Sequence, residues 1–245
     1  MKMTLIKPNI GRREHSLYVD EGRMEPLPLG ILAALTPSDI DVVMYDDRME
    51  RIPYDEPTDI VGITVETFTA RRAYEISAEY RRRGVTVVMG GMHAMLIPDE
   101  VAEHCDCVIV GDAEPVWAQM CEDFRAGRLK ERYTAVQPQC PQTGIIARRD
   151  IFEGKGYLPI SLLQFSRGCS HKCSFCASSV YFGAKHFCRP VDEVVREIKS
   201  QKRKLLFFVD DNIVCEHEKA KELFRALIPL KVRWVSQGSM DMLAD

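Results

Sequence analysis

The chain is organised around residues 165–176, which read Phe165-Ser166-Arg167-Gly168-Cys169-Ser170-His171-Lys172-Cys173-Ser174-Phe175-Cys176. The cysteines leave gaps of three and two residues, so one loop can bring their thiolates to a single polynuclear metal centre. Iron–sulfur cubes are usually held by four thiolates, and three clustered ligands predict a cluster with one iron open to another ligand. That open iron is where chemistry can occur.

Composition and charge narrow the class of protein. The 245 residues are 46% hydrophobic, enough for one large or two ordinary folded domains. The 33 basic and 36 acidic residues give a net charge of -3 without a long single-sign block, so there is no footprint of nucleic-acid binding. No signal-peptide core or membrane-spanning run is present, which predicts a cytoplasmic protein. Nine cysteines, unevenly spaced, favour metal binding in a reducing compartment over a disulfide framework.

The first half of the chain alternates between apolar strands and helices. Strands are predicted at 4–6, 41–45, 59–64, 85–89 and 107–110, and helices at 27–35, 67–83, after Pro98 and up to about Arg125. Such units predict a doubly wound parallel sheet. Its ligands would bind beyond the carboxyl ends of the strands, at the loop after Pro8 and at residues 64–67, 90–93 and 111–114. The Gly-x-Gly-x-x-Gly dinucleotide fingerprint is missing.

A second α/β domain is predicted after a polar, proline-containing stretch. We divide the chain into a first domain at residues 1–130, a linker at 131–159 and a second domain at 160–245. Strands at 161–165, 205–209 and 232–236 alternate with helices at 191–201 and 218–227, which indicates a parallel sheet of the barrel type. Three strands cannot close a barrel.

On these residues the chain resembles the radical S-adenosylmethionine (SAM) enzymes. The resemblance lies in Cys169-x3-Cys173-x2-Cys176, in aromatic Phe175, and in the position of this loop after the first barrel strand. Residues 28–35, 90–98 and 111–114 also resemble the N-terminal domain of the cobalamin-dependent subgroup. The fold that this implies is α/β: a doubly wound, Rossmann-like sheet of the cobalamin-binding type, followed by the first half of a partial (β/α)6 radical-SAM barrel.

The resemblance implies a set of site residues in the second domain. Cys169, Cys173 and Cys176 would hold a 4Fe-4S cluster whose free iron chelates SAM, and one-electron transfer would cleave SAM to a 5'-deoxyadenosyl radical. Phe175 would pack beside the adenine. Where the family commonly has Gly-Gly-Glu, this chain has Val209-Asp210-Asp211-Asn212, so Asp210 or Asp211 would accept hydrogen bonds from the methionine ammonium.

The first domain would bind cobalamin, with candidate contacts at Thr64, Glu66, Gly90, Gly91, His93 and Gly111. The Asp-x-His-x-x-Gly motif that supplies a lower histidine ligand in many cobalamin proteins is absent, and His15 has the wrong spacing. Cobalamin would therefore bind without a histidine ligand, or the domain is degenerate. An alternative role for His93 is to shape the turn at Gly90-Gly91, and those glycines alone also fit a tight turn.

The implied activity is reductive cleavage of SAM for cobalamin-dependent methyl transfer, or related radical chemistry, on an unactivated carbon of a small-molecule substrate. An electron donor such as flavodoxin or ferredoxin would be the partner. One alternative is zinc, bound by the loop cysteines with Cys188, His171 or His186 as the fourth ligand. Another is a non-catalytic cobalamin- or zinc-binding module, or a fragment of a longer enzyme. The remaining thiols are expected to be core or surface residues: Cys105, Cys107, Cys121, Cys140 and Cys215.

Overall fold

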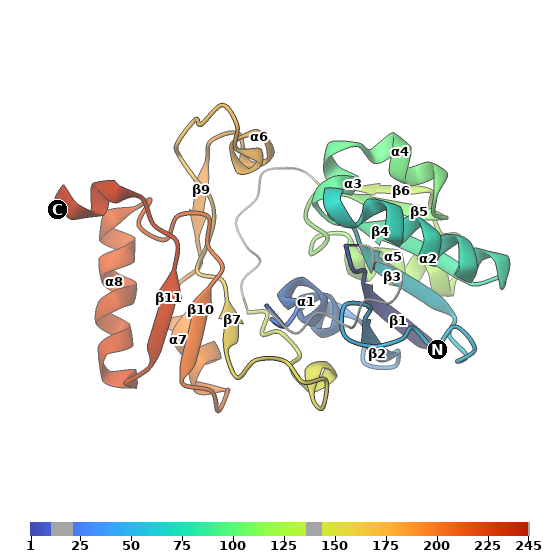
Figure 1. Cartoon of the computed structure of the whole chain (residues 1–245), viewed down its shortest axis with the longest axis horizontal. Coiled ribbons are helices and arrows are strands. Elements are labelled where there is room, and N and C mark those ends of the chain that lie inside the picture. The colour runs from blue at the N-terminus through green and yellow to red at the C-terminus, as the bar shows by residue number, and fades with distance from the viewer. Residues whose placement is uncertain (11–21, 136–143, 245) are drawn as a thin grey trace. The chain divides into compact units, whose positions relative to one another are not determined.

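The structure is a computed structural model that describes residues 1–10, 22–135 and 144–244. The chain divides into two compact units (Figure 1). The first comprises residues 1–136 and 147–156, and the second comprises residues 137–146 and 157–245. We describe each unit by itself.

The first unit is built on a six-stranded sheet in the order β2-β1-β3-β4-β5-β6, in which every pair of neighbours is parallel. Because the order reverses at β1, the point between β1 and β3 is where an open sheet of this kind offers a ligand crevice. The strands are β1 (Lys2–Lys7), β2 (Asp41–Asp46), β3 (Ile60–Thr64), β4 (Thr86–Gly90), β5 (Cys107–Val110) and β6 (Arg132–Thr134).

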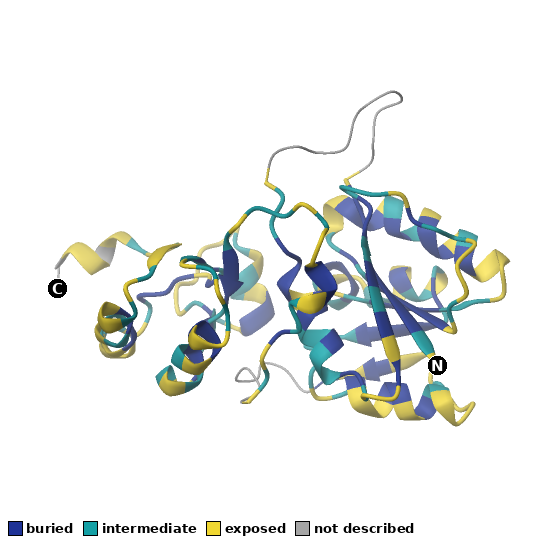
Figure 2. Ribbon diagram, turned by 90° about the horizontal axis from the view of Figure 1, so that it is seen from below, coloured by how far each residue is buried: buried dark blue, intermediate teal, exposed yellow. Residues whose placement is uncertain are grey.

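Helices connect these strands and bury their apolar sides against the sheet. Ala73, Ile76 and Tyr80 recur at helical spacing on α2 and pack into one core with Ile63 and Val87 of the strands. Figure 2 shows the result as buried strands and helices that are buried on one side only. The helical elements are α1 (Leu27–Leu35), η1 (Thr67–Thr69), α2 (Ala70–Arg82), α3 (Met92–Leu96), α4 (Pro98–Glu103), α5 (Trp117–Arg125) and η2 (Asp150–Phe152).

The second unit has a three-stranded parallel sheet in the order β11-β10-β7. Leu206 and Phe208 of β10 are buried in one core with residues of two helices, α7 and α8. An antiparallel pair, β8 and β9, forms a separate short sheet. The elements are β7 (Ser161–Leu163), β8 (Ser166–Gly168), α6 (Ala177–Phe182), β9 (His186–Cys188), α7 (Val191–Lys199), β10 (Leu205–Phe208), α8 (His217–Leu227), η3 (Ile228–Leu230), β11 (Arg233–Ser236) and η4 (Met240–Ala244).

The structure confirms the α/β fold and the parallel sheet of the first half, and it adds elements that the sequence did not predict. Five strands were expected in the first sheet, whereas β6 extends it to six. This strand lies inside the predicted linker, residues 131–159, and its central residue Tyr133 is buried. Residues 147–156 of that stretch also pack with the first unit. In the described part of the chain, no helix is long and apolar enough to cross a membrane.

Candidate metal-binding site

The cysteine loop leaves β8 and returns to the fold in β9, so the antiparallel pair closes residues 169–185 into one loop. Gly168 ends β8 with φ at +79°, a left-handed conformation that favours glycine. A Cβ atom placed there would lie 2.2 Å from the carbonyl oxygen of Lys185 and 2.9 Å from Cγ of Phe182. The residue at the start of the cysteine loop therefore has to be glycine for two independent reasons.

The three loop thiols are accessible, as ligands of an added metal centre must be. Cys169 and Cys176 are half-buried and Cys173 is exposed. The backbone N–H of Ser179, in the first turn of α6, lies at the Cys176 thiol and lowers its pKa by favouring the charged form, which is the thiolate that binds metal. Burial raises the pKa of Cys169.

Three cysteines outside the loop have the opposite character. Cys105, Cys107 and Cys121 are buried in the first unit, and burial raises their pKa to about 11, 12 and 12. They are core residues, one of the two roles that the sequence predicts for them. Accessible sulfur donors clustered in one loop fit an iron–sulfur cluster, because each thiolate of a cube binds a different iron.

Asp210 and Asp211, the candidates for the methionine ammonium, lie directly after β10 and have different surroundings. Asp210 is 2% exposed and accepts hydrogen bonds from the backbone N–H groups of Phe165, at 3.2 Å, and Ser166, and from the Ser166 hydroxyl. Burial raises its pKa to about 6. The carboxylate that points inward is therefore Asp210, and it anchors the segment that leads into the cysteine loop.

Asp211 is exposed and accepts hydrogen bonds from both sides of the segment that carries the three cysteines. One oxygen accepts from the backbone N–H of Gly168 at 3.0 Å, and the other accepts from Oγ of Ser178 at 2.5 Å. Gly168 precedes the first cysteine and Ser178 follows the last. The carboxylate thus holds the three-cysteine segment closed from a neighbouring strand.

Two further residues that the sequence did not single out as site residues contact the loop. The buried amide of Asn212 lies 3.8 Å from Sγ of Cys169 and donates to Oγ of Ser239 at 2.9 Å. Sγ of Cys215 accepts from the backbone N–H of Ser170 at 3.2 Å. Asn212 continues the alternation of buried residues at 206, 208 and 210, but residues 205–209 are all apolar, so the sequence carries no signal that could have identified it.

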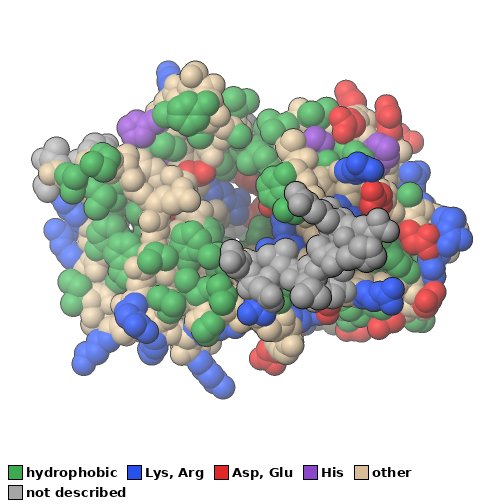
Figure 3. Space-filling model, viewed as in Figure 1, with side chains coloured by type: hydrophobic (Ala, Val, Ile, Leu, Met, Phe, Trp, Pro, Cys, Tyr) green, Lys and Arg blue, Asp and Glu red, His purple; other side chains and the backbone are tan. Residues whose placement is uncertain are grey.

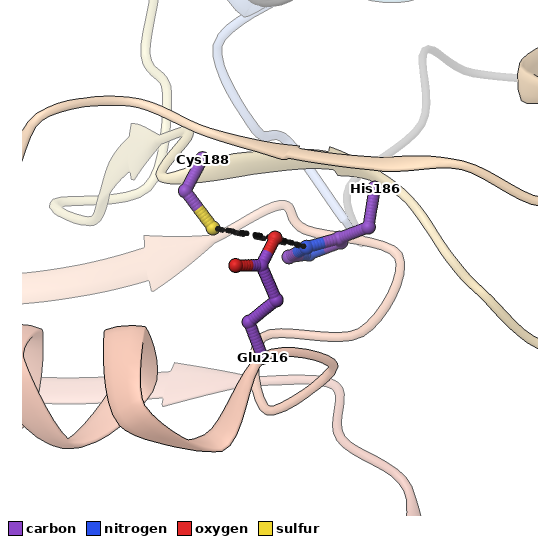
Figure 4. Close-up of side chains that lie close together, drawn as sticks. All are labelled: His186, Cys188 and Glu216. Atoms are coloured by element: carbon purple, nitrogen blue, oxygen red, sulfur yellow. Dashed lines mark hydrogen bonds and ion pairs between the residues drawn. The ribbon is translucent and has the colours of Figure 1, made fainter.

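The other candidates of the second unit are placed as follows. Phe175 is 90% exposed, so its ring is available to a ligand. His186 and Cys188, two of the suggested zinc ligands, lie close to Glu216 (Figure 4). Burial, followed by the nearby charge of Glu216, raises the pKa of Cys188 to about 12. Within residues 1–10, 22–135 and 144–244, these three form the one group of three or more histidine, cysteine or carboxylate ligands that lie within 4.8 Å of one another. The loop cysteines are therefore not assembled into a compact single-ion site.

The cobalamin candidates lie at the carboxyl ends of β3, β4 and β5. Gly91 has φ at +110°, and a Cβ atom there would lie 2.7 Å from the carbonyl oxygen of Val65. The backbone N–H of Val65 donates to the carbonyl oxygen of Gly90 at 2.7 Å, and the backbone N–H of His93 donates to the carbonyl oxygen of Val65 at 3.1 Å. Gly91 thus lets the turn after β4 approach the backbone after β3, as a tight turn requires. Gly111, after β5, also has a left-handed φ of +92°.

The polar candidates of this edge have partners within the first unit. Glu66 forms an ion pair with Lys7 of β1. The His93 side chain is 5% exposed, with Nδ1 3.2 Å from Oγ1 of Thr67 and Nε2 3.5 Å from Glu100. These contacts favour the role of His93 in shaping the turn. Thr64 is half-buried, and His15 lies outside the described residues.

Comparison with known proteins finds methyltransferases among the chains of similar sequence. The chain is 35% identical to the bacteriochlorophyllide d C-8(2)-methyltransferase of Chlorobaculum tepidum over 75% of its length and 43% of that protein. It is 32% identical to the bacteriochlorophyllide d C-12(1)-methyltransferase of the same organism over 99% of its length and 55% of that protein. The chain therefore spans about half the length of the curated relatives it matches.

A solved structure shares the fold. The radical S-adenosylmethionine methyltransferase TsrM from Kitasatospora setae, with tryptophan substrate and a SAM analogue bound, superposes with a TM-score of 0.69 at 18% identity. The match covers 94% of this chain and 51% of TsrM. A second structure of that enzyme, with cobalamin and a [4Fe-4S] cluster bound, gives the same TM-score. No profile of a known protein family matches the sequence.

Proposed function

We propose that the chain belongs to the cobalamin-dependent radical S-adenosylmethionine family and serves cobalamin-dependent methyl transfer, or related radical chemistry, on an unactivated carbon of a small molecule. The observation that carries the proposal is the accessible three-cysteine loop, which Asp210 and Asp211 hold before its first cysteine and Asp211 also holds after its last. Its cofactors would be a 4Fe-4S cluster, SAM and cobalamin, and two structures of TsrM have these cofactors or a SAM analogue bound.

In this proposal the thiolates of Cys169, Cys173 and Cys176 hold the cluster, which when bound supplies the electron that cleaves SAM. Asp210 has its oxygens committed to Phe165 and Ser166, so it serves as an anchor of the loop. Asp211 is exposed and retains lone pairs, because an ionised carboxylate offers about four acceptor positions. We assign the methionine ammonium to Asp211 and the adenine to the exposed ring of Phe175.

The first unit would be the cobalamin-binding domain, with residues 1–130 as its predicted extent and a doubly wound arrangement of helices. Support comes from the strand order, which places the crevice between β1 and β3, where Glu66 follows β3. Gly90 ends the neighbouring strand β4, where an added Cβ atom would make an ordinary contact with Ile109 of β5 at 3.6 Å. With His93 engaged by Thr67 and Glu100, cobalamin would bind without a histidine ligand from this residue.

The second unit would be part of a radical-SAM barrel, predicted to occupy residues 160–245. Both α7 and α8 pack on the side of the sheet that carries Leu206 and Phe208. On the visible face of this unit, hydrophobic side chains gather over the sheet (Figure 3), and Val235 of β11 is 51% exposed. Parallel strands covered by helices on one side are what a barrel segment provides.

We further propose a cytoplasmic location and an electron donor such as flavodoxin or ferredoxin.

Anaerobic reconstitution of the full chain with iron and sulfide tests the cluster. We expect about four irons per chain and a broad absorption shoulder at about 400 nm, as thiolate-ligated clusters give. Cys173→Ala should abolish both signals. Cys215→Ser is the matched control, because its sulfur also lies against the loop, at Ser170, without being a predicted ligand. Stoichiometric zinc without the absorption band, or equal losses in the two variants, would contradict the proposal.

Retention of hydroxocobalamin by the full chain through gel filtration tests the first unit separately. We expect about one cobalamin per chain, and the same amount in Cys173→Ala, since that thiol belongs to the second unit. Cobalamin that elutes free from a folded chain would remove it from the proposal and leave the cluster assignment standing.

A further inference from the structure

Three side chains with metal-binding atoms meet outside the cysteine loop, in the second unit (Figure 4). Nδ1 of His186 lies 3.0 Å from Oε1 of Glu216. Sγ of Cys188 lies 3.7 Å from Nδ1 of His186 and 3.9 Å from Oε1 of Glu216. A nitrogen, a sulfur and an oxygen donor thus surround one point.

Regular secondary structure holds all three donors in place. His186 and Cys188 are two residues apart on β9, so their side chains leave the same face of the strand. Pairing of β9 with β8 fixes that strand opposite Gly168 and Ser166. Glu216 stands at the N-cap of α8, a helix of 11 residues. The geometry therefore comes from a strand pair and a helix rather than from a free loop.

We propose that His186, Cys188 and Glu216 bind a single divalent transition-metal ion, with Zn²⁺ as the ion that suits the set best. Zn–S bonds of about 2.3 Å and Zn–N or Zn–O bonds of about 2.0–2.2 Å place tetrahedral ligand atoms roughly 3.3–3.6 Å apart. The observed separations of 3.0, 3.7 and 3.9 Å lie on both sides of that range. Small side-chain adjustments would suffice to accommodate the ion.

The donor types also select the ion. A thiolate with an imidazole favours zinc and similar borderline ions, whereas Mg²⁺ and Ca²⁺ prefer oxygen ligands alone. The His186 side chain is 4% exposed, but that of Glu216 is 49% exposed, so an ion can enter from the Glu216 side. Binding would release the thiol proton of Cys188 to solvent, and water would complete the fourth position.

This ion would have a defined structural consequence. The cysteine loop ends in β9, and Glu216 begins the helix that follows the Asp210–Asn212 segment. A metal bond would tie the exit of the loop to the same connection that already holds its entry through Asp210 and Asp211. The site is separate from the cluster ligands and does not depend on the proposed methyl transfer.

Zinc binding by the full chain tests the proposal in a host in which Cys169, Cys173 and Cys176 are replaced by serine, so that the loop thiolates cannot compete. After equilibrium dialysis against Zn²⁺ under anaerobic conditions, elemental analysis should find about one zinc per chain. Cys188→Ser, which is nearly isosteric, and Glu216→Gln at the surface should each weaken binding by at least about 10-fold. The matched control, Cys215→Ser, should keep the full zinc content.

Co²⁺ as a spectroscopic probe adds a second readout. The host should show a thiolate-to-cobalt charge-transfer band that disappears in Cys188→Ser and persists in Cys215→Ser. Far-ultraviolet circular dichroism of each variant establishes that the chain is folded. A folded host without bound zinc, or zinc binding that Cys188→Ser leaves unchanged, would overturn the proposal. It would show that hydrogen bonds alone hold His186, Cys188 and Glu216 together.

Discussion

Replacing Gly168 with alanine should destabilise the second unit far more than the same change at Gly183. Both glycines are left-handed, with φ at +79° and +60°, so alanine costs about 1–2 kcal/mol at either site through backbone conformation. At Gly183 nothing lies within 4 Å of the added Cβ atom. At Gly168 the Cβ atom would meet the Lys185 carbonyl oxygen at 2.2 Å, and forced shifts of this kind cost about 1–3 kcal/mol more.

The expected totals are about 2–5 kcal/mol for Gly168→Ala and about 1–2 kcal/mol for Gly183→Ala. Urea unfolding followed by the fluorescence of Trp234 reports on the second unit, where its ring stacks on Phe224 at 4.9 Å between centroids. Since the chain has two tryptophans, the host is Trp117→Phe, which leaves Trp234 as the one reporter. With a slope of about 2 kcal/mol per M, the midpoint should fall by about 1–2.5 M for Gly168→Ala.

Iron content after reconstitution gives a second measurement for the same pair. Because Gly168 fixes the start of the loop that carries Cys169, its alanine variant should also lose cluster loading, whereas Gly183→Ala should retain it. Equal midpoint shifts in the two variants would refute the reasoning, since the steric term is what separates them. A strongly destabilised Gly168→Ala chain with full iron loading would refute the link between this turn and the cluster site.

Three further outcomes follow from the contacts of single side chains. Burial raises the pKa of Asp210 from 3.8 to about 6, so the folded state favours the neutral carboxyl and the unfolding free energy of the second unit should fall by about 3 kcal/mol as pH rises from about 3 to 7. Urea unfolding across this range should show the fall, and Asp210→Asn should flatten it. Asn212→Ala should lower cluster loading without changing the first unit, because its amide lies 3.8 Å from Sγ of Cys169, and iron analysis measures the loss. Trp117→Phe should destabilise the first unit by about 1 kcal/mol, detectable by calorimetry, because it removes the 2.9 Å hydrogen bond to Thr36.

Long elements with clear periodicity could be predicted from the sequence, and short or long-range ones could not. The helix at residues 27–35 is observed as α1 with the predicted bounds, because an apolar run after Pro26 with Pro28 in its first turn has few alternatives. Strand β6 has three residues, of which Tyr133 alone is buried, and it exists through its pairing with β5. Such pairing leaves no local pattern in the sequence. Helix α3, with five residues, is too short to show a helical period.

The candidate site could likewise be predicted only where the signal is local in the sequence. The spacing of the three cysteines identifies the loop without help from the structure, since an iron–sulfur cluster is held by closely spaced thiolates. The β8–β9 pair that closes the loop joins residues about 20 positions apart, as Ser166 and Cys188 do, and neither strand has more than three residues. Asp210 and Asp211 were equivalent in sequence because residues 205–209 are all apolar, so the run gives no indication of which alternate residues face the core.

The alternation along β10 explains how one strand end organises the loop. Residues 206, 208, 210 and 212 are buried in turn, so Asp210 and Asn212 extend the core-facing side of the strand beyond its last hydrogen-bonded residue. Asp210 then binds the backbone before the cysteines, and Asn212 reaches Cys169 itself. Asp211, between them, points to the surface and joins Gly168 to Ser178. Adjacent polar residues of a single strand end therefore contact the loop at its entry, at its first thiol and after its last one. Substitutions at these three positions should therefore alter cluster loading more than they alter the fold of the first unit.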